Sequence, residues 1–106
     1  MNLERIKREK FVDNNARVLR AINMLRTSYV KIRELEYGLA PDISPTEITD
    51  SVNYLLEGGY IHLRDIEYHK PVSDLADAEI ALLEAKLTQK GIQFLNGKIS
   101  DDCIRR

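Results

Sequence analysis

Apolar residues recur at helical spacing through much of this chain, and the clearest run lies at residues 44–57. Four of them share one helical face at i, i+4, i+7 and i+8: Ile48, Val52, Leu55 and Leu56. Ser44 is placed to cap the first turn, Pro45 suits the first helical position, and Glu47 completes a capping box. A glycine pair at 58–59 ends the pattern. We therefore predict a helix over residues 44–57.

The same spacing predicts three further helices. One covers residues 14–26, directly after the cap-forming sequence Asp13-Asn14-Asn15. A short second helix covers residues 31–39 and is bounded by glycine and proline. A last helix begins at Thr88, which suits an N-cap, and stops at Gly97.

Strand signals are weaker. Residues 60–66 alternate as a strand should, and residues 29–30 suit a very short strand. Residues 67–78 have the composition of a loop. Residues 79–87 are ambiguous, because Ala, Leu and Glu favour a helix while the apolar pattern suits a buried strand. We predict a strand there, paired with residues 60–66.

A chain of 106 residues is expected to form one domain. Residues 1–13 are predicted to be a basic extension, residues 14–97 the folded domain and residues 98–106 a loose tail. No apolar run approaches the roughly 20 residues of a membrane helix, so no membrane partner is expected. The chain start lacks the apolar core of a signal peptide, and a single cysteine, Cys103, indicates the cytoplasm.

The net charge of −1 is unevenly distributed. Residues 1–33 carry nine Lys or Arg against three Asp or Glu, and residues 34–84 carry two against twelve. Residues 85–106 carry five against two. This distribution suits ordinary solvated faces, or a basic end that meets phosphate and an acidic middle that repels it.

Two short segments resemble the winged helix-turn-helix family. L-L-E-G-G-Y-I at residues 55–61 is similar to the end of that family's third helix and its first wing strand. L-T-Q-K-G at residues 87–91 is similar to the segment after the wing in PadR-like and MarR-like regulators and in small prophage winged-helix proteins. The resemblance covers residues 16–97. It implies an α+β, mainly helical fold with a three-helix core, a β-hairpin wing and a C-terminal helix.

The resemblance also implies a small transcriptional regulator that binds double-stranded DNA, as a homodimer with half-sites about one helical turn apart. Helix 44–57 would read the major groove, and the 67–78 wing would touch the backbone. The base-reading candidates lie opposite the apolar stripe: Thr46, Glu47, Asp50 and Asn53. The phosphate-binding candidates lie at the second helix, the strand and the wing: Lys31, Arg33, Arg64, His69 and Lys70.

The charge of helix 44–57 supports a second hypothesis. This helix has no Lys or Arg and three acidic residues, Glu47, Asp50 and Glu57, and a carboxylate near a duplex opposes binding. The alternative is a winged-helix protein–protein interaction module that uses this acidic face for a basic partner and does not bind DNA. The resemblance favours DNA binding, and the charge favours a protein partner.

An enzyme is not expected. The glycine pair at 58–59 does not match a phosphate-binding glycine motif. His62 and His69 lie seven residues apart, so on a strand they would point to opposite faces rather than converge on a metal ion. We therefore predict no catalytic residues, no metal and no cofactor.

Overall fold

The first helix begins much earlier than the sequence pattern predicts. In the computed structural model, which describes residues 2–76 and 78–106, α1 spans Leu3–Asn23 and Asn2 caps it. Asn14 and Asn15, interpreted above as the helix start, are buried in the middle of α1. Their side-chain amides donate to the Glu47 carboxylate and to the Cys103 carbonyl oxygen, and Asn2 is the residue that caps the helix. The predicted extension therefore belongs to α1 from residue 3 onwards.

The other three helices match their predicted positions closely. α2 spans Ile32–Leu39, α3 spans Pro45–Glu57 and α4 spans Gln89–Leu95. The predicted capping box at the start of α3 is present, and the Thr88 hydroxyl accepts from the Gly91 N–H at 3.1 Å at the start of α4. These signals were readable because each joins residues only three apart.

Four strands form one antiparallel sheet in the order β1-β4-β2-β3: β1 Val30–Lys31, β2 Ile61–Asp65, β3 Pro71–Val72 and β4 Leu83–Leu87. The strand predicted at residues 79–87 is present only in its second half, since Ile80–Leu82 form a 3-10 turn. β3 was not predicted, and it lies within the segment assigned to a loop. Met1 and Asp77, in the predicted extension and loop, lie outside the described residues.

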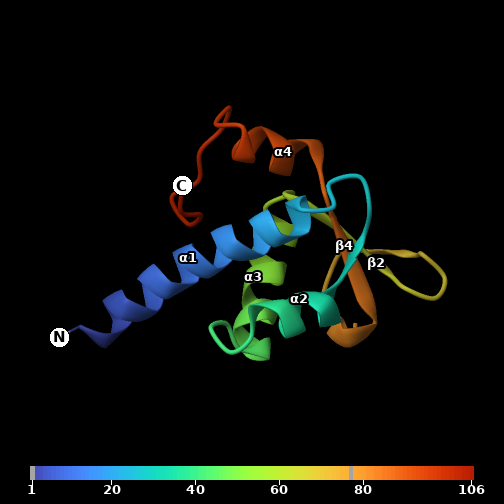
Figure 1. The fold of residues 1–106 in the computed structure, drawn as a ribbon, viewed down its shortest axis with the longest axis horizontal. Coiled ribbons are helices and arrows are strands. Elements are labelled where there is room, and N and C mark those ends of the chain that lie inside the picture. Colours follow the sequence, from blue (N-terminus) through green and yellow to red (C-terminus); the bar gives the residue numbers. More distant parts are fainter. Residues whose placement is uncertain (1, 77) are drawn as a thin grey trace.

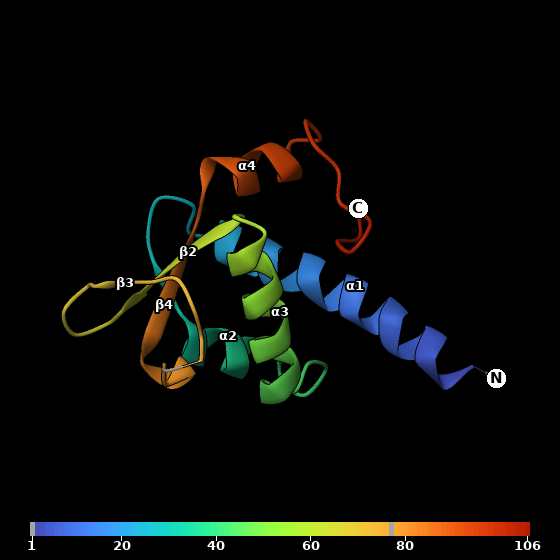
Figure 2. The ribbon, with the colours of Figure 1, turned by 180° about the vertical axis from the view of Figure 1, so that it is seen from behind.

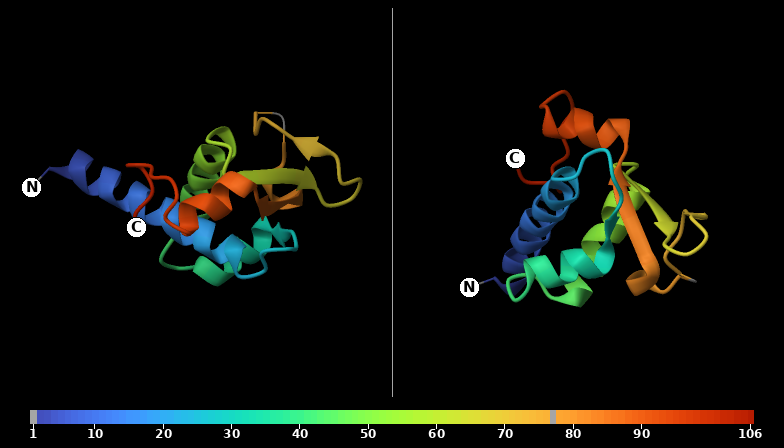
Figure 3. Two further views of the ribbon diagram at one scale, coloured as in Figure 1. Left: turned by 90° about the horizontal axis from the view of Figure 1, so that it is seen from above. Right: turned by 45° about the vertical axis from the view of Figure 1, so that its right-hand side comes forward.

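α1, α2 and α3 cover one face of this sheet (Figures 1 and 3). The buried core joins α1, α3 and the strands; its members include Val18, Leu19, Ile22, Ile48, Val52, Leu55, Ile61, Leu63 and Ala85. The turn between β2 and β3 projects away from the helices. The fold is thus α+β, with four helices and a four-stranded antiparallel sheet in the described part of the chain.

The segment after α4, predicted to be a loose tail, packs against the domain. Ile104 is only 2% exposed. Asp101 accepts hydrogen bonds from Tyr54 and Tyr60, and Arg105 pairs with Glu9 and Asp13 of α1. These partners lie 41 to 96 residues away in sequence, so local pattern carries no sign of them.

Candidate functional site

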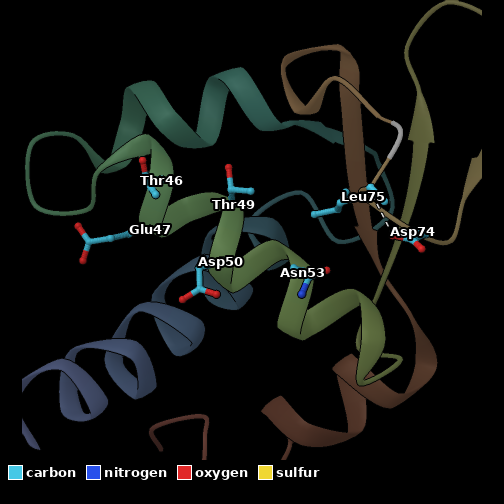
Figure 4. A pocket seen from close by; sticks show the side chains of 8 residues that line it. Thr46, Glu47, Thr49, Asp50, Asn53, Asp74 and Leu75 are labelled. Atoms are coloured by element: carbon cyan, nitrogen blue, oxygen red, sulfur yellow. Dashed lines mark hydrogen bonds between the residues drawn. The ribbon is translucent and has the colours of Figure 1, made fainter. Parts of the chain in front are cut away.

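α3 turns a polar face to solvent on the side opposite its buried stripe. Thr46 and Asp50 are exposed and Asn53 is half-buried. All three border an open hollow between α3 and residues 74–76, which is called the α3 hollow below (Figure 4). It is lined by Thr46, Glu47, Thr49, Asp50, Asn53, Asp74, Leu75 and Ala76. The structure therefore brings the four predicted base-reading residues together on one helix face.

The carboxylate of Glu47 is occupied by its own chain. It accepts from the Ser44 N–H at 3.0 Å and from the Asn14 side chain at 3.2 Å, and it pairs with Lys10 at 2.9 Å. The Lys10 ammonium, followed by the Ser44 N–H, lowers the pKa of Glu47 to about 2. Glu47 thus joins α1 to α3, and its carboxylate has little acceptor capacity left for a base.

Arg64, a predicted phosphate contact, is also engaged within the fold. Its guanidinium Nε lies 2.6 Å from the carboxylate of Glu84, the residue directly opposite on β4. Its Cζ lies 3.6 Å from the ring centroid of Tyr29, a stacking contact typical of arginine. Because Glu84 is only 7% exposed, Arg64 is the counter-charge of a buried carboxylate, and its availability for phosphate is reduced.

The remaining phosphate candidates lie on exposed surface at two separate places. Lys31 and Arg33 stand at the junction of β1 and α2. His69 and Lys70 stand in the turn between β2 and β3, where His69 takes a φ of 58°. The Asp65 carboxylate holds this turn by accepting from the Tyr68 and Lys70 N–H groups at 2.7 and 2.6 Å. The hydrogen bond from Tyr68 is the main cause that lowers the pKa of Asp65.

Two lysines of the predicted basic extension, a possible source of phosphate-binding charge, lie beside α3. Lys7 and Lys10 line a second hollow together with Glu47 and Asp50. Residues 1–13 were assigned to an extension outside the domain, which separated these cations from α3. The i, i+3 spacing of the two lysines was a visible signal, since it places them on one helix face.

No grouping of three His, Cys, Asp or Glu suited to a metal ion occurs among residues 2–76 and 78–106. Neither α1 nor any shorter helix in the described part of the chain combines the length and apolar character of a bilayer-spanning segment. The chain matches no family model, no curated protein and no solved structure.

Proposed function

We propose that this chain is a winged-helix DNA-binding protein, a small transcriptional regulator that places α3 in the major groove. The proposal treats α1, α2 and α3 as the helical core and the β2–β3 turn as the tip of the wing. The sequence resemblance at residues 55–61 and 87–91 supports this assignment, because both segments have the secondary structure that the family requires.

The observation that carries the proposal is the position of α3 between the basic N-terminal half of α1 and the β2–β3 turn, which exposes Lys70 beside Glu67. In Figure 2, α3 stands at the front, with the N-terminal half of α1 on one side and the β2–β3 turn on the other. The first element carries Lys7 and Lys10, and the second carries His69 and Lys70. A helix flanked in this way can enter a groove while its neighbours meet the phosphates on either side.

The role of each side chain follows from the hydrogen-bonding groups and charges that it does not use within the fold. Thr46 and Asn53 offer hydrogen bonds to base edges, and Asp50 can accept from cytosine N4. Lys70, Lys31 and Arg33 are the phosphate contacts, while Glu47 and Arg64 hold the site in shape through their internal pairs. The acidic character of the face predicts weak non-specific affinity and a strong dependence on the correct base sequence.

The test is fluorescence anisotropy with duplex DNA, first at low salt and then across a salt series. We expect saturable binding that weakens steeply with salt. Lys70→Ala should lower the salt slope by about one unit, whereas Lys98→Ala, an exposed lysine beyond α4, should leave it unchanged. With a site selected from random duplexes, Asn53→Ala should relax base preference. If folded protein binds neither generic duplex DNA at low salt nor any duplex selected from a random pool, the proposal is refuted.

One observation favours a protein-binding module as the second candidate. Three carboxylates, Glu47, Asp50 and Asp74, border the α3 hollow, and α3 itself carries no cation. A basic side chain from a partner would be attracted to this surface. This candidate predicts that a Lys/Arg-rich polypeptide binds, that duplex DNA does not, and that Asp50→Asn with Asp74→Asn abolishes the binding.

A further inference from the structure

An apolar groove, called the α1–α2 groove below, lies between the end of α1 and α2. Val30 and Leu35 line it and are 7% and 4% exposed, while Met24 and Leu25 border it and are 83% and 57% exposed. The groove encloses about 410 Å³, within the range of roughly 300–1,000 Å³ typical of small-molecule sites. Two further residues complete its apolar lining, Ala21 and Leu39.

The charge of this groove comes from one acidic side chain. Glu34 is exposed, and in the described part of the chain it is the one charged residue that lines the groove. None of the ion pairs formed among residues 2–76 and 78–106 includes it. The cations nearest in sequence, Arg26, Lys31 and Arg33, do not line the groove, and Lys31 lies opposite Glu84 of β4. The lining therefore favours a ligand with a cationic group.

Open space lies beside the Glu34 carboxylate. Glu34 and Gly38 are four residues apart on α2, so they are neighbours on one helix face. Gly38 also lines the groove, and a Cβ added there would meet nothing within 4 Å. A ligand whose amine bonds to Glu34 can therefore lay its apolar part over Gly38 and against Leu35. The flexible thioether of Met24 borders the same space and suits contact with an aromatic ring.

We propose that the α1–α2 groove binds a small amine with an apolar body. The ammonium group donates to the Glu34 carboxylate, and the body covers Val30, Leu35 and Met24. The enclosed volume matches a small molecule, and the single carboxylate selects a cation over a neutral or anionic molecule of the same shape. Removal of apolar surface from water supplies most of the affinity. This inference does not depend on the proposed function.

Three probes that share one apolar body and differ in charge test the proposal: 4-phenylbutylamine, 4-phenylbutanol and 4-phenylbutanoate. The chain has two methionines, so carbon-13 labelling of their methyl groups gives an NMR signal from Met24, which Met24→Leu assigns. We expect the amine to shift the Met24 signal saturably. The alcohol should bind about threefold to tenfold more weakly than the amine, and the carboxylate more weakly still.

Variants of α2 separate the charge of the groove from its shape. Glu34→Gln should remove the preference for the amine over the alcohol, whereas Glu36→Gln, two residues further along α2 and outside the groove, should keep it. Gly38→Leu should weaken all three probes at least about tenfold, because the new side chain occupies the open space. Leucine suits a helix better than glycine, so this variant is expected to fold, and circular dichroism checks that each variant does.

Three results would each overturn the proposal. The first is a Met24 signal that the amine does not shift at about 10 mM, a concentration at which a probe of this size should bind measurably. The second is an amine that binds no better than the alcohol, or whose advantage survives in Glu34→Gln. The third is a Met24 signal that shifts when the protein alone is diluted, because the occupant of the groove would then be a second copy of the chain.

Discussion

Replacing Asp101 by alanine tests whether the C-terminal segment holds the domain together. Its carboxylate accepts from the Tyr54 hydroxyl at 2.7 Å through both oxygens, and from the Tyr60 hydroxyl at 2.7 Å. The Cys103 N–H donates to it at 2.9 Å. Burial and the bond to Asp101 raise the pKa of Tyr60 to about 12, so this phenol stays protonated and can donate. The Asp101 side chain thus joins the C-terminal segment to Tyr54 of α3 and to Tyr60, the residue directly before β2.

The size of the effect follows from these contacts. Hydrogen bonds to charged groups contribute about 1.5–3 kcal/mol each when they are well formed, and the half-buried position of Asp101 places its bonds at the lower end. Two phenol bonds then predict a loss of about 3 kcal/mol in the free energy of unfolding. For a domain of this size, the melting temperature should fall by about 12 °C. Such a loss is large against a typical total of 5–15 kcal/mol.

Urea unfolding followed by circular dichroism measures the loss, with linear extrapolation to water. Asp102→Ala is the matched control, because Asp102 is the exposed neighbour of Asp101. We expect a loss below about 0.5 kcal/mol in this control. If Asp101→Ala is no less stable than the control, the tail does not anchor the domain and the reasoning fails.

The dependence of this effect on pH has a definite sign. Burial raises the pKa of Asp101, but the hydrogen bonds from Tyr60 and Tyr54 outweigh burial and leave the pKa below its ordinary value. The folded state therefore favours the charged carboxylate. Its contribution to stability is present above the ordinary pKa of aspartate and is lost as the pH falls through the folded value. The stability difference between wild type and Asp101→Ala should accordingly shrink in acid, as urea titrations at successive pH values will measure.

Three further single variants and one double variant test the packing. Arg64→Ala should cost about 2–3 kcal/mol in urea unfolding, since it leaves the buried Glu84 carboxylate without its partner; Arg64→Ala with Glu84→Gln should recover part of the loss. Gly91→Ala should cost about 1–3 kcal/mol in the same assay, because the new Cβ would lie 2.3 Å from the Tyr60 carbonyl oxygen. Gly38→Ala should stabilise the fold by about 0.5–1 kcal/mol and so raise the melting temperature in a thermal scan, because Gly38 is helical and its Cβ position is open.

Interactions between near neighbours were readable from the sequence. The capping box of Ser44 and Glu47, the Thr88 cap and the turn at Gly59, which takes a φ of 80°, each involve residues within three or four positions. Such signals act through local backbone geometry, which depends only on residues close together in the sequence. The positions of α2, α3 and α4 followed from them, and so did the polar face of α3.

Contacts between distant segments decided the rest. Residues 83–87 have good helix-forming composition, yet they form a central strand because β1 and β2 pair with both of its edges. Asn14 lies mid-helix, and its amide donates to Glu47, 33 residues away. The ion pairs of Glu47 with Lys10 and of Arg64 with Glu84 could not be predicted from the sequence either. These pairs determine which polar groups remain free at the surface. The sequence alone therefore specified α2, α3, α4 and the residue types of the candidate site, and tertiary packing alone specified which of those residues are available to a partner.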